Sequence, residues 1–150
     1  GLLHDIGLAM VPAAIQAKSP ELWTDEERRA YEKHPEYTIE IIQSRKLVVS
    51  PLVHQIILQH HEMYNGLGYP KHLQGKRIIP EAQILGLADR FDDLTALVPG
   101  RPRKSPAEAL NELYFNSFRD TTQAFMDPEL MKQVMTLFPS QDMQASAIPA

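Results

Sequence analysis

Hydrophobic residues recur along this chain at the spacing of helices that each bury one face. The segment 81–95 is the clearest case, because Ile84, Leu87, Ala88 and Phe91 keep the i, i+3, i+4, i+7 spacing. Segment 51–61 carries a similar run of leucine, valine and isoleucine. No segment shows a convincing alternation of apolar and polar residues, as a half-buried strand would. The pattern predicts an all-α fold, a helical bundle of roughly six helices.

Polar residues and prolines mark where these helices begin. Thr24 followed by Glu27 is the sequence of a capping box, which starts a helix. Ser105-Pro106 and Asp127-Pro128 each place an N-cap residue before a proline at the first helical position. Pro35 interrupts one helix and suits the first turn of the next.

The most informative stretch is Gln59–Pro70, in which a predicted helix runs into two adjacent histidines. His60 continues the apolar, inward-facing side of this helix, and His61 follows it directly. Two interpretations stay open for this pair: the histidines are metal ligands, or they are hydrogen-bonded residues of a helical core.

A glycine-rich loop follows the histidine pair. Gly66 and Gly68 break the helix and allow a positive φ or a close backbone approach. Tyr69 precedes Pro70, which favours an extended backbone and predicts that the tyrosine ring points out of the loop. A rigid loop beside inward-facing histidines favours a metal site next to a substrate entrance.

The dipeptide His4-Asp5 offers an imidazole and a carboxylate side by side, and a carboxylate can bridge two metal ions. Such a dipeptide is common by chance. Gly7 and Pro12 predict that a helix carrying the pair ends shortly after it.

Two further polar residues are candidates for the same site. His34 lies at the helix junction before Pro35, either aimed inwards or acting as a surface or capping residue. Asp89 borders the apolar face of segment 81–95, where a carboxylate is costly unless it is paired or bound to metal. The remaining histidines, His54 and His72, are predicted to be a structural residue and a solvated loop residue.

Together the candidate ligands are four imidazoles and two carboxylates: His4, Asp5, His34, His60, His61 and Asp89. The chain has no cysteine, so thiolate ligands are excluded and the set suits iron, manganese or another divalent ion of intermediate hardness. The set is large enough for more than one ion. Two ions about 3.5–4 Å apart can hold a phosphodiester and activate a bridging water.

Composition restricts the function classes. With 150 residues, 23% charged and 43% hydrophobic, the chain has the profile of one ordinary globular domain. Its net charge of −4 argues against a non-specific nucleic-acid binder, so DNA is not an expected partner. No apolar run approaches the ~20 residues of a membrane span. The absence of cysteine fits a cytoplasmic location, and the start at Gly1 suggests a segment of a longer polypeptide with an upstream regulatory domain.

These motifs resemble those of the HD-GYP family, a branch of the HD-domain metal-dependent phosphohydrolases. The resemblance rests on four stretches and runs without obvious gaps from about Leu2 to Phe138: His4-Asp5-Ile6-Gly7, His34-Pro35, His60 to Pro70, and Ala88-Asp89. Only the long motif from His60 to Pro70 is highly specific. The resemblance implies an HD-GYP-like domain over residues 1–138, without the family's N-terminal helix or helices, and a flexible tail or linker over 139–150.

The resemblance also implies a function. It identifies the six candidate ligands with the family's site for two or three divalent metal ions, often iron or manganese, with Asp5 as the bridging carboxylate and His4 beside it at the catalytic centre. The implied activity is hydrolysis of cyclic di-GMP, to the linear dinucleotide or to GMP. The implied substrate contacts are Gly66, Gly68, Tyr69, Pro70 and Arg101, and the glycine-rich loop is a possible contact for signalling proteins.

Several positions differ from the family pattern, mostly on the substrate side. Leu8 replaces a lysine, Thr38 replaces a glycine, Asn65 replaces an aspartate, and Val98 replaces the first arginine of an Arg-Pro-Tyr-Arg motif. Two hypotheses follow. The chain is an active phosphodiesterase on cyclic di-GMP or a related cyclic dinucleotide, or it is a degenerate, weakly active or inactive module that binds metal or nucleotide and signals through protein contacts.

Overall fold

The computed structural model describes residues 3–97, 102–118 and 124–138, and this part of the chain contains helices and no strand. The seven α-helices within it are α1 (Ala13–Gln16), α2 (Asp25–Tyr31), α3 (His34–Ser44), α4 (Pro51–Gln59), α5 (Pro80–Thr95), α6 (Pro106–Phe118) and α7 (Pro128–Met135). Three 3₁₀ helices join them: η1 (Ile6–Met10), η2 (Pro20–Leu22) and η3 (Gly75–Arg77). Because α1 is a single turn, the predicted all-α bundle of about six helices is confirmed. The tail predicted over 139–150 lies outside the described residues.

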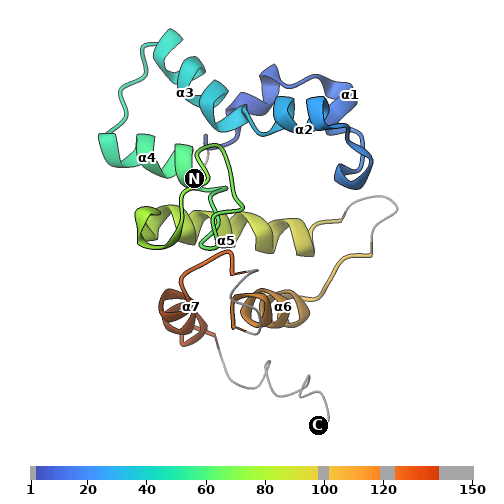
Figure 1. The fold of residues 1–150 in the computed structure, drawn as a ribbon, viewed down its shortest axis with the longest axis vertical. Helices are drawn as coiled ribbons and strands as arrows, with labels where there is room; N and C mark the ends of the chain where they lie inside the picture. Colours follow the sequence, from blue (N-terminus) through green and yellow to red (C-terminus); the bar gives the residue numbers. More distant parts are fainter. Residues whose placement is uncertain (1–2, 98–101, 119–123, 139–150) are drawn as a thin grey trace.

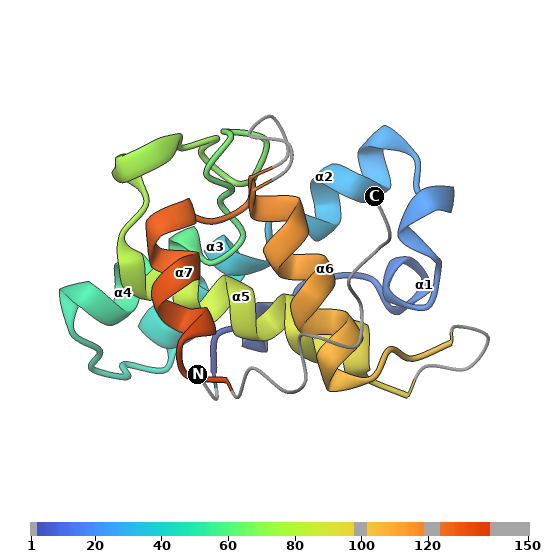
Figure 2. The same ribbon diagram turned by 90° about the horizontal axis from the view of Figure 1, so that it is seen from below.

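Helix α5 is the centre of the arrangement. Figure 1 shows it crossing the middle of the molecule, with α3 and α4 on one side and α6 and α7 on the other. Helices that follow one another in the sequence also contact one another, from α3 through α4, α5 and α6 to α7. Figure 2 shows α6 and α7 lying side by side across α5. None of the helices in the described residues combines the length and apolar character needed to cross a membrane.

Two of the three hydrophobic clusters in the described residues lie on the two sides of α5. The larger one joins α5, α6 and α7 and consists of Leu87, Leu110, Leu113, Phe125, Met126, Met131 and Met135. The smaller one joins α3 and α4 through Ile39, Ile42 and Ile57. The two clusters leave the middle of the molecule, where α5 faces α3 and α4, to polar side chains.

The buried face of α5 differs from the prediction. Ile84 is 46% exposed and Ala88 is also exposed, whereas Gly86 and Leu87 are buried. A Cβ added at Gly86 would lie 2.2 Å from the carbonyl oxygen of His60, so α5 crosses the end of α4 almost in backbone contact. Because α5 is covered from two sides, it has no single apolar stripe. The predicted stripe therefore placed Ile84 and Ala88 on the buried face incorrectly.

The helix starts predicted from capping residues are confirmed. The capping box is complete, since the Thr24 side chain accepts from the Glu27 amide and the Glu27 side chain accepts from the Thr24 amide. The Ser105 hydroxyl accepts from the Glu108 amide before α6, and the Asp127 carboxylate accepts from the Glu129 amide before α7.

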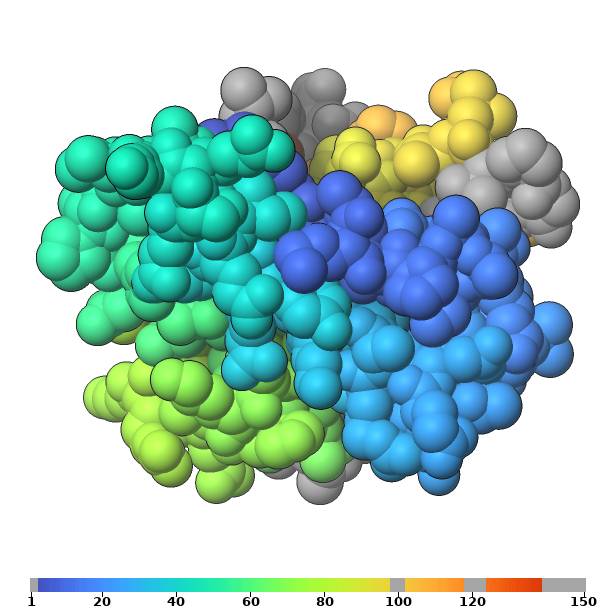
Figure 3. All heavy atoms as spheres, turned by 90° about the horizontal axis from the view of Figure 1, so that it is seen from above, coloured from blue at the N-terminus to red at the C-terminus, as the bar shows by residue number. Residues whose placement is uncertain are grey.

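The N-terminal segment differs from the prediction in one respect. His4 and Asp5 lie in a turn, and η1 begins just after them, whereas the sequence predicted a helix that carries the pair and ends. This segment lies against α3, as the space-filling view in Figure 3 shows. The contact is tight, because a Cβ at Gly7 would lie 2.0 Å from the carbonyl oxygen of His34.

Candidate metal centre

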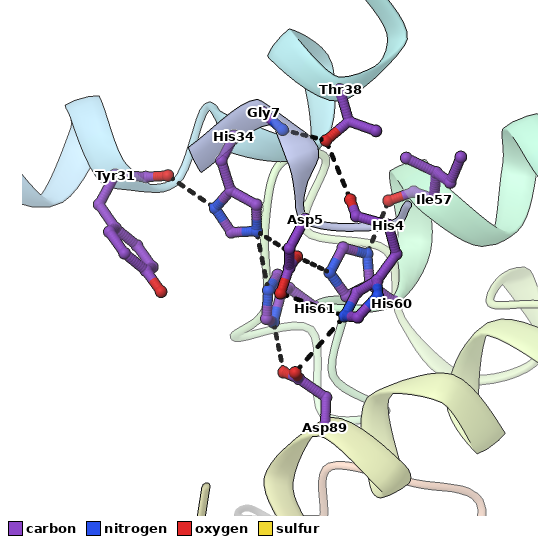
Figure 4. A network of polar contacts seen from close by, with 10 residues as sticks. All are labelled: His4, Asp5, Gly7, Tyr31, His34, Thr38, Ile57, His60, His61 and Asp89. Atoms are coloured by element: carbon purple, nitrogen blue, oxygen red, sulfur yellow. Dashed lines mark hydrogen bonds and ion pairs between the residues drawn. The ribbon is translucent and has the colours of Figure 1, made fainter. Parts of the chain in front are cut away.

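The turn that carries His4 and Asp5 is fixed to α3 by one buried hydroxyl. Thr38 is fully buried, and its Oγ1 accepts a hydrogen bond from the Gly7 amide at 2.9 Å. The same hydroxyl donates to the carbonyl oxygen of His4, also at 2.9 Å. One hydroxyl thus contacts the backbone on both sides of Asp5, whose carboxylate is directed towards the neighbouring histidines (Figure 4).

His34 and His60 are held in the same way at two different helix ends. His34 is the first residue of α3, and its Nδ1 lies 2.9 Å from the carbonyl oxygen of Tyr31. His60 caps the end of α4, and its Nδ1 lies 2.7 Å from the carbonyl oxygen of Ile57. A carbonyl oxygen can only accept, so each Nδ1 carries the proton. In this tautomer the lone pair lies at Nε2, which is the atom that can bind a metal.

Asp5 lies between these rings and His4. Its Oδ1 is 3.3 Å from Nε2 of His34 and 3.3 Å from Nε2 of His60, whereas its Oδ2 is 3.1 Å from Nε2 of His4. The two carboxylate oxygens thus face two different sets of neighbours. This arrangement is compatible with the bridging role that the family resemblance implies for Asp5, which stays a prediction.

The other two candidates complete these sets. Nε2 of His61 lies 3.0 Å from Nε2 of His34, and Nδ1 of His61 lies 3.9 Å from Asp89. Asp89, on α5, is also 3.5 Å from Nε2 of His4. Figure 4 shows the six side chains converging from the N-terminal turn, α3, the end of α4 and α5.

The candidate ligands form two groups that share Asp5. The first ligand group is Asp5, His34, His60 and His61, and the second ligand group is His4, Asp5 and Asp89. Within each group the potential ligand atoms all lie within 4.8 Å of one another. The structure therefore brings together all six residues selected from the sequence, and their role as metal ligands stays a prediction.

Protonation at this site suits a divalent ion. Burial and the neighbouring rings of His60 and His34 lower the pKa of His61 to about 2, so this imidazole is neutral at neutral pH. Burial opposes ionisation of Asp5, but hydrogen bonds with His34 and His60 hold the pKa of its carboxyl well below the usual range. Neutral imidazoles and ionised carboxylates are the states that bind divalent ions. The ligand atoms of each group lie within 4.8 Å of one another, and a positive charge between them would reduce the repulsion of their lone pairs. These residues therefore fit a metal site.

The glycine-rich loop packs over His61. Gly66 has φ +84°, and a Cβ at Gly68 would lie 2.2 Å from the amide nitrogen of Met63, so both glycines are required by the backbone. The Tyr69 ring leaves the loop, as predicted, and stacks on the His61 ring with centroids 4.7 Å apart. The Tyr69-Pro70 peptide bond is cis. Arg101 and Val98 lie outside the described residues.

Sequence reasoning missed the residues that support this site. Glu62 is 4% exposed, and its carboxylate accepts hydrogen bonds from the amides of Lys71 and Leu73 at 2.7 and 2.8 Å, which closes the glycine-rich loop. Thr38 was considered only as a departure from the family pattern. Glu62 could have been selected from the sequence, because it directly follows the two inward-facing histidines and a buried carboxylate needs hydrogen-bond partners. No signal in the sequence indicates which backbone groups either residue contacts.

Tyr31 is a further neighbour of the site that the sequence did not reveal. Its ring lies edge-on to His34, with centroids 5.1 Å apart. Burial and the carboxylates of Asp5, Asp93 and Asp89 raise the pKa of Tyr31 to about 12, so its phenol is protonated at neutral pH.

Comparison with known proteins agrees with this geometry. The sequence profile of the family described as "HD domain" matches residues 1–122. The chain is 36% identical over 115 residues to the cyclic di-GMP phosphodiesterase response regulator RpfG of Xanthomonas campestris pv. campestris, covering 75% of this chain and 29% of that protein. It is 37% identical over 94 residues to the 3'3'-cGAMP-specific phosphodiesterase 2 of Vibrio cholerae, covering 63% of this chain and 18% of that protein.

A solved structure supports the same relationship. Bd1817, described as an HDG"Y"P protein from Bdellovibrio bacteriovorus, superposes with a TM-score of 0.63 and 26% sequence identity. The match covers 91% of this chain and 40% of that one, and the chain spans less than a third of the two relatives above. The chain therefore belongs to the HD-domain family, in its HD-GYP branch.

Proposed function

We propose that this chain is the catalytic domain of a metal-dependent phosphodiesterase that hydrolyses a cyclic dinucleotide, with cyclic di-GMP as the favoured substrate. The observation that carries the proposal is the position of Asp5, whose two oxygens face two groups of candidate ligands. The substrate class is supported by the names of the relatives, which act on cyclic di-GMP or 3'3'-cGAMP.

In this proposal one ion is held by the first ligand group and a second by the second ligand group, with Asp5 common to both. Nitrogen and oxygen ligands without sulfur favour iron or manganese. Two ions held by these residues would supply an activated water molecule and positive charge opposite the phosphate oxygens.

The chain's own residues orient the candidate ligands and form the contacts proposed for the substrate. The Nδ1 hydrogen bonds of His34 and His60 fix both rings, so their Nε2 atoms need no reorientation when ions bind. Tyr69 covers one side of His61 and presents an aromatic ring to a ligand at the centre. The glycine-rich loop, including Gly66, Gly68 and Pro70, and also Arg101, are the proposed contacts for the rest of the substrate.

The test is metal analysis and turnover on one anaerobically purified sample of the full chain, with two histidine variants. We expect two or more ions per chain and the formation of linear dinucleotide or GMP from cyclic di-GMP. His60→Gln should lose metal and turnover, because it removes an Nε2 ligand. His54→Gln is the matched control, since His54 lies on α4 outside both ligand groups, and it should retain both properties. A wild-type chain that turns over substrate without metal would refute the proposal.

The second hypothesis from the sequence keeps one observation in its favour. Leu8 lies in η1 as a half-buried aliphatic residue and brings no charge to a phosphate. A degenerate module would bind metal without turnover and act through a signalling partner, and the exposed Leu67 of the glycine-rich loop is the contact we propose for it. Metal retention in the wild type and absence of turnover of cyclic di-GMP and 3'3'-cGAMP would favour this alternative.

A further inference from the structure

Tyr31 ends α2 beside the metal centre and is not one of its candidate ligands. Figure 4 shows its ring on the side of the cluster away from His60, with the hydroxyl directed towards the side where Asp89 lies. The carboxylates of Asp5, Asp89 and Asp93 all act electrostatically on this phenol, and the phenol acts in turn on that of Tyr69. The position of the ring itself is given by its edge-on contact with His34, at a centroid distance of 5.1 Å.

The Tyr31 ring is held rigidly. The Trp23 ring packs against it with centroids 4.6 Å apart, and His34 contacts it edge-on at 5.1 Å. Trp23 is itself anchored, because its Nε1 donates to the carbonyl oxygen of Ile15 at 3.0 Å. In addition, the carbonyl oxygen of Tyr31 accepts from His34 Nδ1, so the backbone of Tyr31 is linked directly to the ring of a candidate ligand.

The Tyr31 hydroxyl makes no hydrogen bond within the described part of the chain, although the residue is half-buried. The hydroxyl is accessible from solvent, so a molecule bound at the centre can reach it. A rigidly held ring beside a candidate ligand, with a hydroxyl that has no partner in the described chain, is suited to donate to a molecule that binds at the centre.

We propose that Tyr31 is a substrate-contacting residue that donates a hydrogen bond from its hydroxyl to a non-bridging oxygen of a phosphodiester bound at the metal centre. A phosphodiester bound between the two ligand groups would bring its non-bridging oxygens to the cluster that the Tyr31 ring borders. The inference rests on the proposed function, because that function supplies the phosphodiester.

The test compares Tyr31→Phe with wild type in the manganese-loaded full chain. Phenylalanine removes only the hydroxyl and keeps the contacts with Trp23 and His34. Tyr114→Phe is the matched control, because Tyr114 packs in the cluster of α6 and α7 on the other side of α5. Three quantities are measured for each variant: manganese per chain, the affinity for inorganic phosphate by calorimetry, and kcat and KM for cyclic di-GMP.

We expect Tyr31→Phe to retain its manganese, to bind phosphate about 10-fold more weakly, and to lose about 10- to 100-fold in kcat with a smaller change in KM. Tyr114→Phe should match wild type in all three. A residue that only packs would leave phosphate affinity and kcat unchanged when its hydroxyl is removed.

The outcomes separate this inference from the proposed function. If wild type turns over cyclic di-GMP and Tyr31→Phe does so equally well, the role of Tyr31 is refuted and the function stands. If wild type has no turnover but binds phosphate in a Tyr31-dependent manner, the hydrogen bond stands and the function fails. If wild type neither binds phosphate nor turns over substrate, both are wrong.

Discussion

Replacing Thr38 by valine should destabilise this protein by about 2–4 kcal/mol, although valine has almost the same shape as threonine. Thr38 is fully buried, and its Oγ1 is 2.9 Å from both the Gly7 amide nitrogen and the His4 carbonyl oxygen. Valine places a methyl group between these two backbone groups and leaves both without their partner. Because this hydroxyl anchors the turn that carries Asp5, we also expect metal binding to weaken.

The magnitude follows from the two hydrogen bonds. Leaving one buried backbone group unsatisfied costs about 1–3 kcal/mol, and the part-buried carbonyl of His4 belongs at the low end of this range. Thr38→Ser is the matched variant, since it keeps the hydroxyl and removes only a buried methyl group, at about 1 kcal/mol. The order of stability should therefore be wild type, then serine, then valine.

Urea unfolding of the metal-free chain measures this order, and manganese titration measures the effect on the site. The second ligand group contains His4, whose carbonyl is held by Thr38, so its affinity should fall more than that of the first group. The reasoning is refuted if the valine variant is as stable as wild type, or if serine destabilises more than valine. Either result would mean that the methyl group, and not the hydroxyl, stabilises this contact.

Two further predictions concern the same region. Glu62→Gln should destabilise by about 2–3 kcal/mol in urea unfolding, because the amide offers one oxygen to the two amides of Lys71 and Leu73, and an unchanged midpoint would show that the loop is held by other contacts. The folded-state pKa of His61 lies below its unfolded value of 6.5, so the unfolded chain binds a proton that the folded chain does not, and stability falls as pH falls. In the metal-free chain, the free energy of unfolding of wild type should fall below pH 6.5 more steeply than that of His61→Asn, by about 1.4 kcal/mol per pH unit. Thermal unfolding at several pH values measures both slopes. Equal slopes for the two proteins would contradict the lowered pKa of His61.

The candidate ligands could be selected from the sequence because each carries a local signal. His60 continues an apolar helix face, and Asp89 borders one, so both had to point towards the interior and both needed a partner there. That they meet was an inference from residue type and from the family resemblance. Their distances result from contacts between helices, such as the close crossing at Gly86, which no local pattern contains.

The residues that orient the ligands could not be selected in this way. The Thr38 hydroxyl contacts backbone groups 31 and 34 positions earlier in the chain, and a threonine inside a helix gives no sign of such partners. The face of α5 was assigned incorrectly for a related reason. Periodicity reports one apolar stripe, whereas a helix at the centre of the molecule is covered on two sides and exposes Ile84.

The structure changes how the departures from the family pattern should be weighed. In the sequence, Leu8 and Thr38 looked alike, as losses from an ancestral site. In the structure they are different: the Thr38 hydroxyl makes two buried hydrogen bonds that hold the turn of His4 and Asp5, whereas Leu8 adds only an aliphatic side chain. A residue that is merely tolerated in a degenerate site does not need hydrogen-bond partners on both sides of its hydroxyl. Thr38 has such partners in the Gly7 amide and the His4 carbonyl. The Thr38 hydroxyl therefore holds the candidate ligands His4 and Asp5 in place, and the proposed Tyr31 donor is the place to look for a contact with phosphate that Leu8 does not supply.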